Sequence, residues 1–289
     1  MHLELSFELP SRDAAAAEAA ALACGACAVT FLDAGDDPVL EPAAGELRLW
    51  PATAVRCLFE EPVDLTLLRQ ALAAALGIDP SRIGVQELLE RAWEREWQKD
   101  SHALRFGQRL WVCPQHETVK DPDAVVVSLD PGLAFGTGSH PSTALCLTWL
   151  DAQLPSRARL IDYGCGSGVL AIAAARLGAS EVHAFDIDPQ ALTATRENAC
   201  ANGVPVVHVH EAAATLPEGV DVLLANILCR SLCELAMPFA ALVRAGGVIV
   251  LSGLMTHEVA DVTAAYGACF DVTAFGARND WVCLAGRRR

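Results

Sequence analysis

Three glycines separated by single residues, Gly164, Gly166 and Gly168, follow a short apolar stretch and open an Ala-rich segment. The apolar stretch predicts a buried strand, and the glycines predict a tight turn into a helix. A backbone without Cβ atoms can turn sharply and lie directly against a ligand. The next predicted strand ends at Asp186, 18 positions after Gly168, where a carboxylate can reach the two hydroxyls of a ribose. These residue types therefore predict a nucleoside site.

The spacing of the glycines distinguishes between nucleoside cofactors. A dinucleotide turn reads G-x-G-x-x-G and rests a pyrophosphate on a helix N-terminus, whereas residues 164–168 read G-x-G-x-G. Asp162, just before the turn, would repel a pyrophosphate but can help to hold the amino-acid end of a sulfonium cofactor. The pattern favours S-adenosylmethionine over NAD.

Asn226 ends a predicted strand in the segment L-L-A-N-I-L, where the methyl group would be presented. Enzymes that methylate planar amides or bases commonly have Asn-Pro-Pro-aromatic here, but Ile227, Leu228 and Cys229 follow in this chain. This difference argues against a nucleobase or glutamine amide as acceptor and leaves amines. Methyl transfer needs mainly the alignment of amine, methyl and sulfur, so we assign no general base and expect Asn226 to orient the amine. A purely structural cap is the alternative for Asn226.

A loop at residues 130–143 leads into a predicted helix that carries His140 and Thr143 at its start, with Pro141 suited to the first turn. The positive end of a helix dipole favours an anion, and the Thr143 hydroxyl could donate to a carboxylate or only cap the helix. Two roles remain possible for His140, either as a catalytic base or as a residue that braces the loop.

Four segments together resemble the PrmA-type methyltransferases of large-subunit ribosomal protein eleven, and the resemblance extends along the whole chain. They are D-P-G-L-A-F-G-T-G-S-H-P-S-T at 130–143, D-Y-G-C-G-S-G at 162–168, F-D-I-D-P at 185–189 and A-N-I-L at 225–228. The resemblance implies an S-adenosylmethionine-dependent enzyme that methylates lysine side chains and the terminal α-amine of a large-subunit ribosomal protein. It implies Thr143, Gly164, Asp186 and Asn226 as cofactor-binding residues, and no metal.

Alternating β and α segments after residue 105 predict a doubly wound α/β sheet that ends in a reversed strand. Together with the resemblance, they indicate a class I, Rossmann-like, seven-stranded methyltransferase domain at 105–289. Residues 1–90 follow a β-α-β-β-α-β pattern, which predicts a small ferredoxin-like α+β domain, and the resemblance gives it the task of recognising the substrate. Residues 91–104 are expected to form a linker helix, in which Trp93 and Trp97 serve core packing or docking.

The pattern within residues 1–90 locates its elements as follows. We expect strands at 2–9, 28–33 and 82–89, a strand pair or one broken strand at 46–59, and helices at 11–24, capped by Ser11, and at 64–76. The C-x-x-C of Cys24 and Cys27 has no second pair and is expected to serve packing.

The net charge of −15, from 36 acidic and 21 basic residues, argues against direct capture of nucleic acid and favours a basic protein partner. Residues 1–85 hold 13 Asp and Glu against 5 Arg, either to steer that partner or only to keep the surface solvated. No signal peptide or membrane span is evident, so a cytoplasmic monomer is expected. The alternatives are a methyltransferase for RNA or a small molecule, or a silent cofactor-binding assembly factor.

Overall fold

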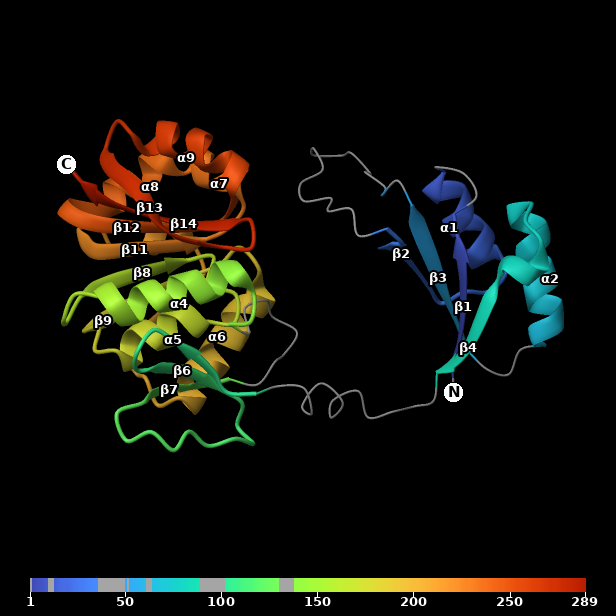
Figure 1. The fold of residues 1–289 in the computed structure, drawn as a ribbon, viewed down its shortest axis with the longest axis horizontal. Coiled ribbons are helices and arrows are strands. Elements are labelled where there is room, and N and C mark those ends of the chain that lie inside the picture. The colour runs from blue at the N-terminus through green and yellow to red at the C-terminus, as the bar shows by residue number, and fades with distance from the viewer. Residues whose placement is uncertain are drawn as a thin grey trace. The chain divides into compact units, whose positions relative to one another are not determined.

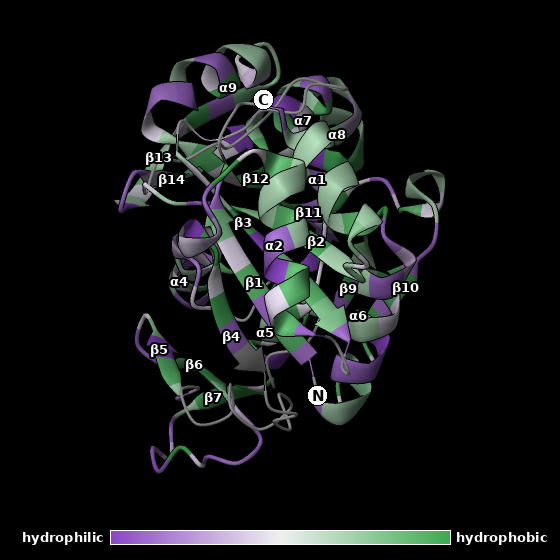
Figure 2. Ribbon diagram, turned by 90° about the vertical axis from the view of Figure 1, so that its right-hand side faces the viewer, coloured by the Kyte–Doolittle hydropathy of each residue, from purple (hydrophilic) through white to green (hydrophobic). Residues whose placement is uncertain are grey.

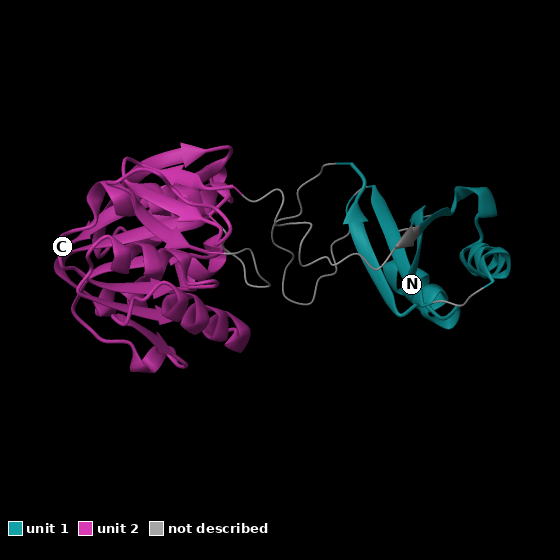
Figure 3. Cartoon of the chain, turned by 90° about the horizontal axis from the view of Figure 1, so that it is seen from below, with its two compact units in different colours: residues 1–96 teal, residues 97–289 magenta. Residues whose placement is uncertain are grey.

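The computed structural model describes residues 2–9, 13–35, 50, 52–60, 64–88, 102–129 and 138–289. The chain divides into two compact units, residues 1–96 and residues 97–289 (Figure 3). Among the residues that the structure describes, unit 1 has one hydrophobic core cluster and unit 2 has two. Parts of three predicted features lie outside the described residues. They are residues 46–49 of the strand region expected at 46–59, most of the linker helix with Trp93 and Trp97, and residues 130–137 of the cofactor loop.

Unit 1 has the element order β-α-β-β-α-β. Its elements are β1 (His2–Glu8), α1 (Ala14–Ala23), β2 (Ala28–Asp33), β3 (Thr53–Glu60), α2 (Leu65–Leu76), the short 3-10 helix η1 (Pro80–Arg82) and β4 (Gly84–Leu88). The four strands form an antiparallel sheet in the order β2-β3-β1-β4. Every second residue of β1, namely Leu3, Leu5 and Phe7, is buried in the core that the sheet shares with the two helices.

The predicted cap of the first helix is wrong. The helix begins at Ala14, and the carboxylate of Asp13 accepts a hydrogen bond of 3.0 Å from the backbone N–H of Ala16. An N-cap side chain must reach the second or third N–H of the helix. Because the helix starts later than its Ala-rich composition suggests, the residue that meets this condition is Asp13.

Unit 2 begins with a small sheet that the sequence analysis did not separate from the main one. It contains β5 (Leu104–Phe106), β6 (Leu110–Cys113) and β7 (Val125–Ser128), with β5 and β6 antiparallel and β6 and β7 parallel. The turn between β5 and β6 is held by Asp151, whose carboxylate accepts the backbone N–H of Gln108 at 2.5 Å and of Arg109 at 3.3 Å. The boundary expected at residue 105 therefore falls inside β5.

The main sheet of unit 2 has seven strands in the order β10-β9-β8-β11-β12-β14-β13. All neighbours are parallel except β14, which runs antiparallel to both β12 and β13. Chain order is α4 (Pro141–Gln153), β8 (Arg159–Tyr163), α5 (Val169–Arg176), β9 (Glu181–Phe185), α6 (Pro189–Ala201), β10 (Val207–His210), η2 (Ala213–Thr215), β11 (Val220–Asn226), α7 (Cys229–Glu234), α8 (Ala236–Leu242), β12 (Val243–Met255), η3 (Thr256–Glu258), α9 (Val259–Tyr266), β13 (Phe270–Arg278) and β14 (Trp281–Arg288). The predicted seven-stranded sheet with a reversed strand is confirmed.

Helices cover both faces of this sheet (Figure 1). Alternate strand residues point to opposite faces, so Leu160 and Val222 join the cluster under α4, α5 and α6, while Ile161 and Leu223 join the cluster under α7, α8 and α9. Figure 2 shows hydrophobic residues along the strands and hydrophilic ones in the loop between β6 and β7 and on parts of α9. Because β8 to β12 run parallel to one another, their carboxyl ends lie at one edge of the sheet, where ligands bind in such folds.

Candidate functional site

The turn after β8 contains the three glycines at 164, 166 and 168, which have φ values of +81°, +54° and +80°. Side chains other than hydrogen are disfavoured at such angles. The carbonyl oxygen of Phe185, at the end of β9, accepts the N–H groups of Gly164 at 2.8 Å and of Cys165 at 3.0 Å. The end of β9 thus holds the glycine turn against the sheet edge.

Asp186 lies directly beside this turn. One carboxylate oxygen accepts the backbone N–H of Gly166 at 2.9 Å, and the other accepts the N–H of Asp188 at 3.0 Å. Asp186 is partly exposed, so its remaining lone pairs can meet a ligand. Asp188 instead caps α6 by accepting the N–H of Gln190 at 2.8 Å.

Asp162 is fully buried beneath the turn. Its Oδ2 accepts the backbone N–H of Ala171 at 3.0 Å, but its Oδ1 has no hydrogen-bond partner among the described residues. Burial, followed by the nearby carboxylate of Asp186, raises the pKa of Asp162 to about 7. A buried, unpaired carboxyl oxygen is costly and suits a cationic ligand group. The residues present therefore fit a cofactor with an ammonium group better than a pyrophosphate.

Thr143 and Asn226 meet at the same sheet edge, although they are 83 positions apart. The side-chain amide of Asn226, at the end of β11, donates to the hydroxyl of Thr143 over 3.1 Å. Thr143 is almost completely buried in the first turn of α4. This contact leaves the amide oxygen of Asn226 as an acceptor for another group.

His140 is the N-cap of α4. Its Nδ1 accepts the backbone N–H of Ser142 at 3.3 Å and lies 2.7 Å from the Ser142 hydroxyl. Its ring packs edge-on against Trp281 of β14, with the centroids 4.7 Å apart. Burial lowers the pKa of His140, so the neutral, hydrogen-accepting form is favoured. The cap of this helix is therefore His140, and Thr143 is engaged by Asn226.

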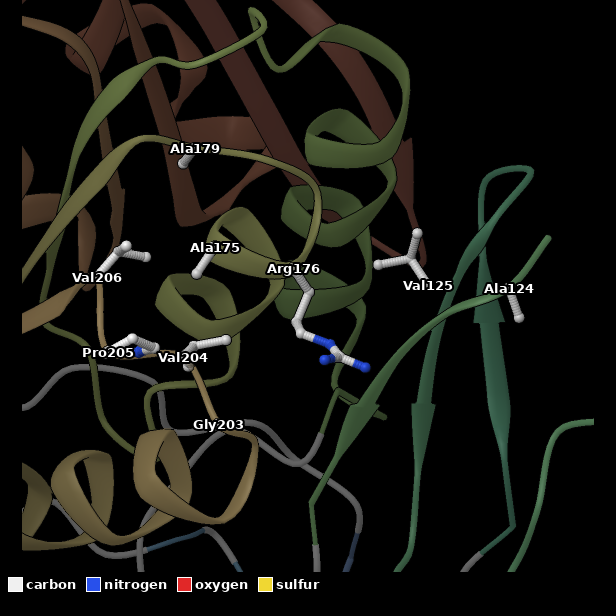
Figure 4. Close-up of a pocket in the computed structure, with 9 residues that line it drawn as sticks. All are labelled: Ala124, Val125, Ala175, Arg176, Ala179, Gly203, Val204, Pro205 and Val206. Atoms are coloured by element: carbon white, nitrogen blue, oxygen red, sulfur yellow. The ribbon is translucent and has the colours of Figure 1, made fainter. Parts of the chain in front are cut away.

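A separate cavity of about 410 Å³ lies on the opposite edge of the sheet. Figure 4 shows Arg176 extending from the end of α5 between Val125 and Val204. Ala179 and Val206, which also line the cavity, precede β9 and β10. The cavity is therefore at the amino ends of these strands. Its lining residues include neither the residues of the glycine turn nor Asp186.

Among the residues that the structure describes, no group of three or more His, Cys, Asp or Glu side chains is arranged to hold a metal ion. Within the same residues, no helix is both long and apolar enough to span a membrane.

The fold and the site define the class of this protein. A seven-stranded sheet with one reversed strand, a glycine turn after β8 and an acidic residue at the end of β9 form a class I, S-adenosylmethionine-dependent methyltransferase. Residues 1–289 match the family described as ribosomal protein L11 methyltransferase (PrmA), and the chain belongs to this family.

Individual relatives agree with this assignment. The chain is 45% identical over 289 residues to a ribosomal protein L11 methyltransferase of Pseudomonas aeruginosa (strain LESB58), with 99% of this chain and 98% of the relative covered. It is 50% identical over 268 residues to that of Methylococcus capsulatus, with 92% of each chain covered. A crystal structure of a ribosomal protein L11 methylase from Lactobacillus delbrueckii subsp. bulgaricus matches with a TM-score of 0.61 and 30% identity, covering 65% of this chain and all of that one.

These findings confirm the predicted family, the predicted enzyme class and S-adenosylmethionine as the cofactor. Two contacts of the residue after Asn226 were not predicted from the sequence, namely those of Ile227 with Gly164 of the glycine turn and with Gly253 of β12. A glycine inside a strand often marks a bulge or a close backbone approach, and this signal was present at Gly253.

Proposed function

We propose that this protein transfers methyl groups from S-adenosylmethionine to lysine side-chain amines and the N-terminal α-amine of ribosomal protein L11. The observation that carries the proposal is the convergence of Asp162, Asp186 and Asn226 at one sheet edge, where Asn226 is followed by Ile227 and Leu228. The names of the relatives supply the substrate protein. These names do not favour RNA or a small molecule as the methyl acceptor, and they do not favour a role as a silent assembly factor.

Each polar residue of the site has a distinct task in this proposal. Asp186 binds the ribose hydroxyls, Gly164 lets the backbone approach the cofactor, and Thr143 holds the methionine carboxylate at the start of α4. The unpaired oxygen of Asp162 faces the ammonium group at the same end of the cofactor. His140 braces the start of α4 through Ser142 and Trp281.

The acceptor amine must reach the site without its proton. S-adenosylmethionine supplies an activated methyl group, which the amine nitrogen takes in line with the departing sulfur. A lysine amine has an ordinary pKa of about 10.4, and an apolar surrounding lowers it. Ile227 is partly buried and Leu228 is 53% exposed, so they provide that surrounding. The free amide oxygen of Asn226 accepts an N–H of the unmethylated or monomethylated amine and orients its lone pair.

Substrate capture belongs to the ferredoxin-like unit at residues 1–90, whose acidic excess attracts a basic ribosomal protein. Only 6% of the chain is aromatic, which leaves the acceptor pocket open enough for repeated methylation. We therefore propose several modified amines, each with up to three methyl groups, in a cytoplasmic monomer that does not bind nucleic acid directly.

The test is exhaustive reaction of the purified full chain with ribosomal protein L11 and labelled cofactor, followed by intact mass measurement and peptide mapping. Several trimethylated amines are the expected products. Ribosomal RNA in a parallel reaction serves as the competing acceptor. A single monomethylated residue as the only product, or label in the RNA alone, would contradict the proposal.

A further inference from the structure

Ile227, the residue after Asn226, is enclosed by two glycines from different parts of the sheet. On one side lies Gly164 of the glycine turn, where an added Cβ would overlap the Cγ2 methyl of Ile227. The missing side chain of Gly164 therefore makes room for Ile227. The Cγ2 methyl of Ile227 lies directly against Gly164 of the glycine turn.

On the other side lies Gly253, inside β12. A Cβ on Gly253 would overlap the carbonyl oxygen of Ile227 and would lie 2.9 Å from its carbonyl carbon and 3.0 Å from its nitrogen. Gly253 has φ of +85°, and the pairing of β12 with β14 shifts register between Leu251 and Leu254. Such a bulge redirects the strand next to a functional site. The backbone of Ile227 thus packs directly against Gly253.

Hydrogen bonds connect this arrangement to the rest of the site. The N–H of Ile227 donates to the carbonyl oxygen of Ser252 at 3.2 Å. The hydroxyl of Ser252 is buried and lies 3.2 Å from the carbonyl oxygen of Ser142 in the first turn of α4. Asn226 reaches the same turn through Thr143. Residues 226 and 227 are therefore held from the glycine turn, from β12 and from α4.

We propose that Ile227 is a positioning residue, whose Cγ2 methyl sets the distance between the glycine turn, which carries the cofactor, and Asn226, which orients the amine. The inference rests on the proposed function of Asn226. Methyl transfer depends on the alignment of nitrogen, methyl and sulfur, and a displacement of about 1 Å can cost a large factor in rate. Loss of this contact would therefore slow transfer more than it weakens cofactor binding.

The shape of the side chain at position 227 separates positioning from simple burial. Valine is branched at Cβ like isoleucine, so it keeps a methyl group in the Cγ2 position and a stiff χ1 angle, and Ile227→Val retains the contact with Gly164. Leucine has nearly the volume of isoleucine but carries its branch on Cγ, so Ile227→Leu loses that contact. Positioning predicts that valine is the better substitute. Burial of apolar area alone predicts that leucine is.

The experiment measures kcat and KM for ribosomal protein L11, the Kd for S-adenosylmethionine by calorimetry and the thermal midpoint, all with the full chain. Ile249→Leu is the matched control, because Ile249 is buried in the core cluster against which Ile227 packs, while its partners on the neighbouring strands are Leu223 and Gly286. We expect Ile227→Leu to lower kcat roughly tenfold or more with little change in cofactor Kd. Ile249→Leu should remain close to the parent, and Ile227→Val should retain more of the parent kcat than Ile227→Leu does.

Equal or higher kcat for Ile227→Leu than for Ile227→Val would overturn the inference, and so would a cofactor Kd that weakens in proportion to the loss in kcat. Asn226→Ala separates this failure from failure of the proposed site. If Asn226→Ala loses activity while the substitutions at Ile227 show no order, only the role of Ile227 is wrong. If Asn226→Ala keeps the parent kcat, the orienting role of Asn226 is wrong and the inference falls with it.

Discussion

Replacing Asp162 with asparagine should stabilise the protein at alkaline pH and weaken its affinity for S-adenosylmethionine. The carboxyl group of Asp162 is fully buried, and only one of its oxygens has a hydrogen-bond partner. Its ordinary pKa is 3.8, and burial raises it to about 7 in the folded protein. The folded state therefore holds a proton that the unfolded chain has already released between these two values.

The sign and size of the effect follow from this difference. Because the folded state binds more protons than the unfolded chain from pH 3.8 to about 7, the parent loses stability as the pH rises through this range and loses no more above it. Between pH 5 and 7 the loss is about 3 kcal/mol, at roughly 1.4 kcal/mol per pH unit. Asparagine does not titrate. Like the protonated carboxyl of Asp162, the asparagine side chain places a donor group without a partner at the buried position. The stabilities of the two proteins should therefore differ least at low pH.

Urea denaturation of parent and Asp162→Asn at pH 5 and pH 8 measures the effect. The stability of the variant relative to the parent should rise by about 3 kcal/mol between the two pH values. Calorimetry at pH 8 should show weaker cofactor binding by the variant, because the ammonium group loses a carboxylate. A stability difference that is the same at pH 5 and pH 8 would refute the reasoning about the buried carboxyl.

Three further outcomes are expected. Asp186→Ala should weaken cofactor binding by about 1.5 to 3 kcal/mol, the value of a charge-assisted hydrogen bond, whereas Asp188→Ala, which removes the cap of α6, should leave it nearly unchanged in calorimetry; equal losses would contradict the ribose assignment. A fragment of residues 97–289 should bind the cofactor but lose turnover of ribosomal protein L11, and turnover equal to that of the full chain would contradict the division of tasks. Burial lowers the pKa of His183 below 6.5, so the contribution of His183 to stability should fall as the pH drops below 6.5, opposite in sign to the contribution of Asp162; in urea denaturation the stability of His183→Gln relative to the parent should therefore rise over this range, and an unchanged difference would assign the effect to other groups.

Local patterns in the sequence were sufficient to predict much of the fold of the catalytic unit. The apolar strand before Gly164, the alternation of strands and helices and the acidic residue at the end of β9 are all properties of short segments. Because parallel strands have their carboxyl ends at one edge of the sheet, these segments also predict that Asp186 lies beside the glycine turn, where it accepts the N–H of Gly166. The cap of α6 at Asp188 could be predicted for the same reason, because capping involves only three successive residues.

Other features depend on packing between distant segments, which no local pattern encodes. The separate sheet of β5, β6 and β7 forms because its turn is held by Asp151, more than 40 positions away. The contact between Asn226 and Thr143 joins the end of β11 to the start of α4.

The buried site shows the same division. The sequence placed Asp162 before the glycine turn, but the unpaired oxygen and raised pKa depend on how completely α5 and the sheet exclude water. Likewise, glycine at positions 164 and 253 indicated sharp turns or close approaches, while only the tertiary structure identified Ile227 as the residue between them. The sequence alone therefore determined which residue types stand at the ends of the strands, because strands and turns are local. The fold decided which of these residues touch and which are shielded from water, because burial and contact arise only when distant segments pack together.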